Sequence, residues 1–268
     1  MPMPRPWKPT LTIQLSVLTH GAAALALLLL PSAWPWAAAA LLANQLILCL
    51  GSLLPRSAWL GPNLTRLPAA AVQRREIALT IDDGPDPEVT PRVLDLLDVA
   101  GAKASFFCIG QRARQYPELC REIVARGHSV ENHSESHAKT FATFGPRRMR
   151  ADVAAGQATL GDICGRPPQF FRPTAGLRNP FLEPVLAGLD LHLATWTRRA
   201  FDTRQGDPEV VLQRLQRDLA AGDILLLHDG NAARTKRGEP VIVAVLPGLL
   251  QSIAAAHLTP VTLTAALR

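Results

Sequence analysis

Two short segments of the chain carry the residue types that metal-dependent hydrolysis needs. Asp82 and Asp83 follow an apolar run and precede a Gly-Pro pair, while His133 and His137 lie together further along the chain. Two imidazoles and one carboxylate can bind zinc, iron, cobalt or manganese and leave a position open for water. The second carboxylate can then act as a general base on that water. The pattern predicts a hydrolase site with Asp83, His133 and His137 as metal ligands and Asp82 as the base.

Each motif alone has a simpler interpretation. An Asp-Asp-Gly sequence is often a turn or a helix cap, and a His-x-x-x-His pair is often on a solvated helix face. Here residues 76–81 are typical of a buried strand that leads into the carboxylates, and residues 127–132 of a second strand that leads into the histidines. Two strand ends that carry metal-ligand residues indicate a single site.

The chain resembles the polysaccharide deacetylases of the NodB-homology type, carbohydrate esterase family four. The resemblance covers about residues 76 to 265 and rests on five motifs in family order. These motifs are Thr80–Gly84, His133–His137, Phe171–Gly176, Trp196 with Asp202, and Leu226–His228. Arg199 departs from the pattern, since many members carry an aspartate there, and Thr174, Ala175 and Thr203 replace groove residues that are often proline or aromatic.

The resemblance implies a role for each matched residue. Asp82 would be the general base, Asp83, His133 and His137 the metal ligands, and His228 the general acid. Arg172 would orient Asp82, Asp202 would tune His228, and the backbone N–H of Ala175 would donate to the developing oxyanion. Trp196 and Leu226 would contact substrate. Judged by residue type alone, a tryptophan or a strand leucine is more often part of the core. The implied cofactor is one divalent metal, with zinc expected and cobalt, iron, manganese or nickel as alternatives.

Alternating strand and helix patterns fill the remainder of residues 76–268. Such alternation predicts parallel strands with right-handed crossovers and an active face at their carboxyl ends. The family resemblance makes the expected fold an α/β, distorted and incomplete (β/α)7 barrel. The expected strands are 76–81, 104–109, 129–132, 169–172, 191–195, 223–228 and 257–263, and the expected helices are 91–99, 116–126, 146–160, 180–187, 208–221 and 241–256.

The N-terminal region is apolar and predicts a transmembrane helical hairpin. Residues 11–30 and 34–54 are two runs without formal charge, each close to the roughly 20 residues that span a bilayer. Trp34 and Trp36 between them suit a membrane interface. We therefore expect a membrane region at 1–54, a linker at 55–75 and a catalytic domain at 76–268. A cleaved signal peptide is the alternative interpretation of the first run.

Charge gives an expected location and substrate. Arg5 and Lys8 precede the first run, and Arg56, Arg66 and further arginines follow the second, so the positive-inside rule places both ends in the cytoplasm. We expect a multi-pass protein of a bacterial inner membrane with a cytoplasmic catalytic domain, and a periplasmic domain as the alternative. The net charge of +6 and the pI near 9.7 favour anionic lipid or a phosphate-bearing substrate over nucleic acid.

The expected activity is removal of an N-acyl group, acetyl or formyl, from an amino sugar. A cytoplasmic domain would meet a lipid-linked saccharide, whereas a periplasmic domain would meet peptidoglycan or an exported glycan. A non-catalytic carbohydrate-binding or scaffolding protein on the same barrel is the alternative. Such a protein usually loses a ligand or the base, and this chain keeps all of them.

Overall fold

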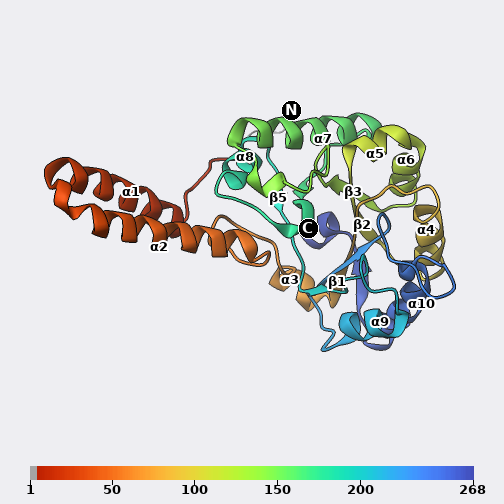
Figure 1. The fold of residues 1–268 in the computed structure, drawn as a ribbon. Helices are drawn as coiled ribbons and strands as arrows, with labels where there is room; N and C mark the ends of the chain where they lie inside the picture. The colour runs from red at the N-terminus through yellow and green to blue at the C-terminus, as the bar shows by residue number, and fades with distance from the viewer. Residues whose placement is uncertain (1–4) are drawn as a thin grey trace.

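A curled parallel sheet forms the centre of the molecule in a computed structural model, which describes residues 5–268 (Figure 1). Its spatial order is β5-β4-β3-β2-β1-β7-β6, with β8 paired to the start of β1, and all these pairings are parallel. The strands are β1 Glu76–Asp82, β2 Ala104–Cys108, β3 Ser129–Asn132, β4 Phe170–Phe171, β5 His192–Leu193, β6 Arg198–Arg199, β7 Ile224–His228 and β8 Thr259–Val261. The fold is the expected distorted, incomplete (β/α)7 barrel.

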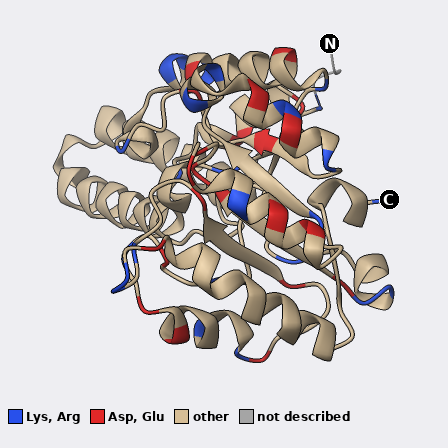
Figure 2. Cartoon of the chain, turned by 90° about the vertical axis from the view of Figure 1, so that its right-hand side faces the viewer, with Lys and Arg blue, Asp and Glu red and all other residues tan. Residues whose placement is uncertain are grey.

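Helices follow most of the strands and cover the outer face of the sheet (Figure 1). They are α3 Ala69–Gln73, α4 Thr90–Val99, α5 Gly110–Gln115, α6 Pro117–Ala125, α7 Pro146–Cys164, α8 Leu182–Gly188, α9 Pro208–Gln216, α10 Val241–Ala255 and α11 Leu263–Ala266. Short 3-10 turns occur at Phe141–Thr143 and Thr174–Gly176. Acidic and basic residues occur on many of the same elements in Figure 2.

The apolar core explains why the strands read as continuous hydrophobic runs. β1 and β7 are buried along nearly their whole length because helices cover one face and the barrel interior the other. One large cluster joins Leu79 and Phe106 of the sheet to Leu94 of α4 and Leu246 of α10. The carboxyl ends of the strands are therefore held on a rigid base.

Several short elements differ from the sequence-based expectation. The strand β6 and the helices α3, α5 and α11 were not predicted, and the expected helix 116–126 is preceded by α5. The two residues of β6 are arginines, so neither hydrophobic alternation nor β propensity identifies them as a strand. The expected strand 257–263 is limited to β8, because the following residues turn into α11.

Two apolar helices project from the barrel as an antiparallel pair (Figure 1). α1 spans Leu11–Leu29 and α2 spans Trp34–Leu53, with a 3-10 turn at Pro31–Ala33 between them. Both are long and apolar enough to cross a membrane. The amide of Asn44 donates to Ser16 Oγ at 3.1 Å, so a buried polar contact links the two helices. We call this pair the N-terminal hairpin.

Both ends of the hairpin are attached to the barrel. Before α1, the guanidinium of Arg5 pairs with Glu183 of α8 at 2.7 Å. After α2, the side chain of Arg178 donates to the carbonyl of Ser57, and the backbone of Leu64 bridges to the residue after β5. The segment 55–75, expected as a linker, is thus packed on the sheet, with Leu60 and Leu67 buried, and the boundaries of the expected three-part division stay a prediction.

Two glycines of α7 give a matched test of this packing. A Cβ at Gly156 would lie 2.9 Å from the backbone carbon of Ser134 and 3.0 Å from the backbone nitrogen of Glu135, whereas a Cβ at Gly161 would meet only Pro167 at 3.6 Å. We expect Gly156→Ala to lower the free energy of unfolding by about 1–3 kcal/mol, because backbone cannot move aside cheaply. Gly161→Ala should be neutral or stabilising, since alanine is the better helix former. Thermal unfolding of both variants in one detergent checks this, and equal effects would contradict it.

Candidate active site

The sequence-predicted residues come together at the carboxyl edge of the sheet. β1 ends at Asp82, β3 ends at Asn132 just before His133, and β7 ends at His228. Asp82 and His228 are partners in the register of the adjacent strands β1 and β7. Parallel strands place their carboxyl ends on one edge, so segments far apart in sequence converge there.

Asp83, His133 and His137 form a compact set of three metal-ligand side chains. Asp83 Oδ1 lies 3.1 Å from His133 Nε2 and 3.0 Å from His137 Nε2. The ligand atoms all lie within 4.8 Å of one another, and this is the one such cluster among residues 5–268. Burial alone would raise the pKa of Asp83, but the hydrogen bonds from both histidines hold it below its usual range. The carboxylate is therefore ionised, as a metal ligand must be.

A backbone hydrogen bond sets the orientation of His133. Its Nδ1 lies 2.6 Å from the carbonyl oxygen of Arg172, which is a pure acceptor, so Nδ1 carries the proton. The nitrogen that faces Asp83 is then Nε2, which donates to that carboxylate and would offer its lone pair to a cation once its proton is released. This tautomer and the three convergent donors fit a divalent metal of the zinc type.

Asp82 lies next to this cluster but is held by a different partner. The buried guanidinium of Arg172 donates to Asp82 Oδ1 at 2.6 Å, and the other carboxylate oxygen lies 3.9 Å from His133 Nε2. Arg172 is fully buried and also donates to Thr80 Oγ1 and to the carbonyls of Ala194 and Thr195. The ion pair leaves one oxygen of Asp82 directed toward the metal-ligand cluster.

His228 and Asp202 form a second buried pair beside Asp82. His228 Nδ1 lies 2.8 Å from Asp202 Oδ1, and the backbone N–H of His228 donates to Asp202 Oδ2 at 2.7 Å. Burial by itself would lower the pKa of His228, but the charge and hydrogen bond of Asp202 outweigh it and raise that pKa to about 9. The imidazole is therefore protonated at neutral pH and its Nε2–H is available as a proton donor.

The remaining predicted residues line the same edge. Ala175 is exposed in the turn after β4 and has a left-handed backbone (φ 56°), an uncommon conformation for a residue with a Cβ. Trp196 is largely buried, and its ring lies against Gly176, where a Cβ would come within 2.5 Å of it. Leu226 is buried in β7 directly opposite Thr80. The ring of Trp196 lies 5.8 Å from the guanidinium of Arg172, and Leu226 lies two residues before His228 in β7.

Sequence reasoning missed two residues that hold Asp83. Asn231 donates from its amide to Asp83 Oδ2 at 3.0 Å. Arg112 donates to the backbone carbonyl of Asp83 at 2.8 Å and to Asn231 Oδ1 at 3.2 Å. The run His228-Asp229-Gly230-Asn231 after a buried strand is a signal that could have identified Asn231, because polar residues at a strand end often belong to a site. No local pattern marks Arg112.

Asp229 is buried beneath the site without a place in the predicted set. Its carboxylate accepts a 2.5 Å hydrogen bond from Thr90 Oγ1 and another from the N–H of Gly230. Burial raises the pKa of Asp229 to about 7 despite these hydrogen bonds. A Cβ at Gly84 would lie 2.4 Å from this carboxylate, so Asp229 and Gly84 fit together closely. Asp229 thus braces the turn that presents Asp83.

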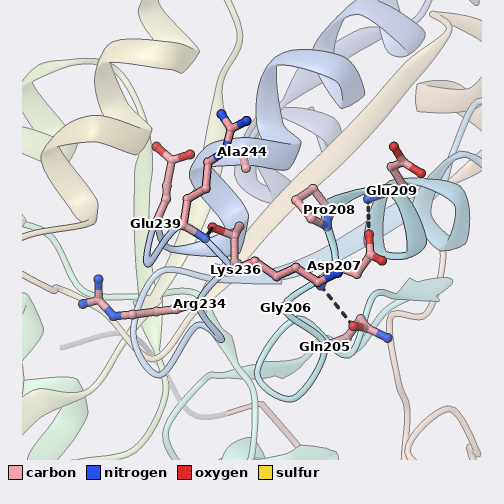
Figure 3. A pocket seen from close by; sticks show the side chains of 11 residues that line it. Gln205, Gly206, Asp207, Pro208, Glu209, Arg234, Lys236, Glu239 and Ala244 are labelled. Carbon is pink, nitrogen blue, oxygen red and sulfur yellow. Dashed lines mark hydrogen bonds between the residues drawn. The ribbon is translucent and has the colours of Figure 1, made fainter.

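A cleft of about 830 Å³ opens between the loops that follow β6 and β7 (Figure 3). None of the predicted site residues line it. Its charged residues are three basic and three acidic ones, namely Arg234, Lys236, Arg237, Asp207, Glu209 and Glu239. The acidic and basic side chains balance, so the cleft carries no net charge.

The chain is similar to known carbohydrate deacetylases. A family model described as polysaccharide deacetylase matches residues 69–194. A peptidoglycan-N-acetylglucosamine deacetylase of Bacillus cereus is 33% identical over 175 residues, which cover 65% of this chain and 81% of that protein. A chitooligosaccharide deacetylase of Azorhizobium caulinodans is 32% identical over 155 residues, covering 58% of this chain and 73% of that protein.

Solved structures give the same result. A family 4 carbohydrate esterase from Streptomyces lividans, in complex with acetate, superimposes with a TM-score of 0.63 at 30% identity. The superposition covers 69% of this chain and 91% of that one. Fold, motif order and sequence identity together show that the chain belongs to the polysaccharide deacetylase family, the NodB-homology proteins of carbohydrate esterase family four.

Proposed function

We propose that this protein is a membrane-anchored, metal-dependent N-deacetylase that removes an acetyl or formyl group from an amino sugar. One observation carries the proposal. Asp83, His133 and His137 converge on one point, while Asp82 is held beside them by Arg172 and left free of that cluster. A ligand set and a separate base within reach of it are what hydrolysis of an unactivated amide requires.

Asp83, His133 and His137 would hold the divalent metal, with zinc as the expected ion. When bound, such a cation lowers the pKa of water and polarises an acyl oxygen. Asp82 accepts the proton of the attacking water, and the ion pair with Arg172 fixes the direction of this carboxylate. The backbone N–H of Ala175 donates to the oxygen that gains negative charge as water adds to the acyl carbon.

His228 completes the reaction at the other side of the acyl group. As the C–N bond breaks, the protonated imidazole transfers its proton to the amine nitrogen, which leaves as the free amino sugar with acetate or formate as the second product. Asp202 keeps the imidazole protonated until that step. Trp196 and Leu226 would contact the sugar and the acyl group.

The relatives suggest the class of sugar. One is named for the N-acetylglucosamine of peptidoglycan and another for chitooligosaccharides, so an N-acetylglucosamine-type unit in a glycan or a lipid-linked saccharide is the proposed substrate. Ala175 and Thr203 stand where many members carry aromatic groove residues. With less aromatic surface for successive sugar rings, a short or lipid-linked saccharide is favoured over a long polymer.

The N-terminal hairpin supports membrane anchoring. Residues 10–55 contain no Asp, Glu, Lys or Arg, and the hairpin exposes large apolar side chains such as Leu28 and Trp36. A contiguous apolar surface of this kind is costly in water. The residues before α1 and after α2 contact the same region of the barrel, which favours a hairpin that begins and ends on one side of the membrane. The basic residues that flank the hairpin support the cytoplasm as that side.

A non-catalytic carbohydrate-binding protein remains the second candidate, and a pair of variants separates it from the enzyme. We expect the zinc-loaded full chain to release acetate from N-acetylglucosamine oligosaccharides. Asp82→Asn should retain zinc but lower turnover by about a hundredfold or more, because the base is lost. His133→Ala should lose both zinc and turnover. Elemental analysis and an acetate assay check this, and turnover by Asp82→Asn near the wild-type rate would refute the assigned base.

The pairing of His228 with Asp202 predicts the alkaline limit of activity. Because Asp202 raises the pKa of His228 to about 9, the acid stays protonated through neutral pH and is lost above that value. In Asp202→Asn the charge and the hydrogen bond of Asp202 are lost, and only the charges of Asp82 and Asp83 still oppose burial, so the alkaline limb of kcat/KM should move to lower pH by about one unit or more. The pH profile of kcat/KM for both proteins checks this. An unmoved limb would exclude His228 as the acid.

Topology tests the anchoring. At the C-terminus, after Arg268, we expect a reporter that works only in the cytoplasm to be active. At residue 31, between the two helices, we expect a reporter that works only in the periplasm to be active. Periplasmic activity of the C-terminal fusion would instead mean that one run spans, and would direct substrate tests toward cell-wall glycans.

A further inference from the structure

Arg199 lies beside the proposed site and has no role in the chemistry described above. It is the last residue of β6 and is paired in register with Leu226 of β7, two residues before His228. Consecutive strand residues face opposite sides of a sheet, and Arg198 points away to form a 3.0 Å ion pair with Asp223. Arg199 therefore faces the side on which Trp196 lies, with its guanidinium carbon 5.3 Å from that ring.

The charge of Arg199 is unpaired. Across residues 5–268, its side chain forms neither an ion pair nor a hydrogen bond, and its Nε is buried without a partner. A guanidinium that is half-buried and unpaired is costly unless an anion or a polar group completes it. The neighbouring Arg198 is paired with the carboxylate of Asp223, whereas no carboxylate of the described residues pairs with Arg199.

Aromatic rings hold the guanidinium in place instead. Arg199 lies 5.0 Å from the ring of Phe201 and is thus framed by two aromatic faces, while Arg214 approaches Phe201 at 5.7 Å. Phe201 has a left-handed backbone (φ 59°), which is uncommon for a bulky residue, and the residue is 49% exposed. Strained residues of this kind tend to cluster where a ligand is held. Cation–π contacts fix the direction of the cation but leave its N–H donors free.

The field of Arg199 reaches the catalytic centre. Burial lowers the pKa of Arg172, and the positive charge of Arg199 acts in the same direction. The loop that starts at Phe201 also carries Asp202, which holds His228. An anion bound at Arg199 would therefore lie next to the sugar whose N-acyl group reaches Asp82 and His228.

We propose that Arg199, framed by Trp196 and Phe201, binds an anionic group that the amino-sugar substrate carries close to its N-acyl group. The group is a phosphate or a carboxylate, because the planar fork of arginine matches both. This inference rests on the proposed function and narrows its substrate to charged saccharides. The phosphate of a lipid-linked sugar and the carboxylate of an acidic sugar are the two sources of this chemistry.

Binding of deacylated sugars tests the proposal without turnover. Glucosamine, glucosamine 1-phosphate and muramic acid are titrated calorimetrically into the full zinc-loaded chain in detergent micelles. We expect one charged sugar to bind about 10- to 100-fold more tightly than glucosamine, as for one charge-assisted contact. Preference for glucosamine 1-phosphate indicates a phosphate, and preference for muramic acid indicates a carboxylate.

Three variants make the result specific. Arg199→Gln should abolish the preference for the charged sugar, and Arg199→Lys should keep part of it. Arg217→Gln, which removes the same charge from a side chain that is 83% exposed at the end of α9, should keep all of it. The thermal unfolding of each variant shows that it is folded.

Two results would overturn the proposal. The first is that the wild-type protein binds neither charged sugar more tightly than glucosamine. The second is that Arg199→Gln keeps the full preference for the charged sugar over glucosamine. Failure of the proposed function is a separate outcome, since it would appear as charged-sugar binding without release of acetate from the acetylated forms.

Discussion

Arg172 is the residue on which the geometry of the whole site depends. Its side chain fixes Asp82 and fastens β1 to the end of β5, and its backbone carbonyl fixes the tautomer of His133. One residue thus positions both the proposed base and a proposed metal ligand. Breaking a buried ion pair by removal of one partner costs about 3–5 kcal/mol, so the arginine is also a condition for folding. A substitution of Arg172 would therefore change both the stability of the fold and the geometry of the site.

Several residues around the same edge of the sheet have a strained backbone. Asp83, His137, Ala175 and Asn231 all adopt left-handed conformations although none is glycine. Each such residue costs about 1–3 kcal/mol and persists only where its surroundings hold it. The buried strands beneath them and the brace from Asp229 to Gly84 provide that support. The rigid core therefore maintains a site that the local chain would not adopt by itself.

The sequence predicted the fold and the metal-ligand cluster for an identifiable reason. Asp83 and His133 each follow a buried strand whose apolar run is visible in the sequence, and the strand ends must meet. The assignments that failed were of short elements such as β6, whose two arginines carry no strand pattern. The polar run at the end of β7 could have indicated Asn231 as a site residue, but its contact with Asp83 depends on tertiary structure. The unpaired charge of Arg199 also depends on tertiary structure, and no local pattern indicates it. The catalytic roles and the domain boundaries stay predictions.

The attachment of the hairpin to the barrel has a mechanical consequence. Pro55, two residues after the end of α2, packs closely on Gly176, since a Cβ added to Gly176 would lie 3.0 Å from the Pro55 side chain. Gly176 in turn packs on the ring of Trp196. A helix end is thus wedged against the turn that carries Ala175. If the hairpin spans a bilayer as proposed, its tilt responds to the thickness of the hydrocarbon layer. Lipid composition would then change how Pro55 packs against Gly176 and Trp196. A fragment that lacks the hairpin would lack this contact.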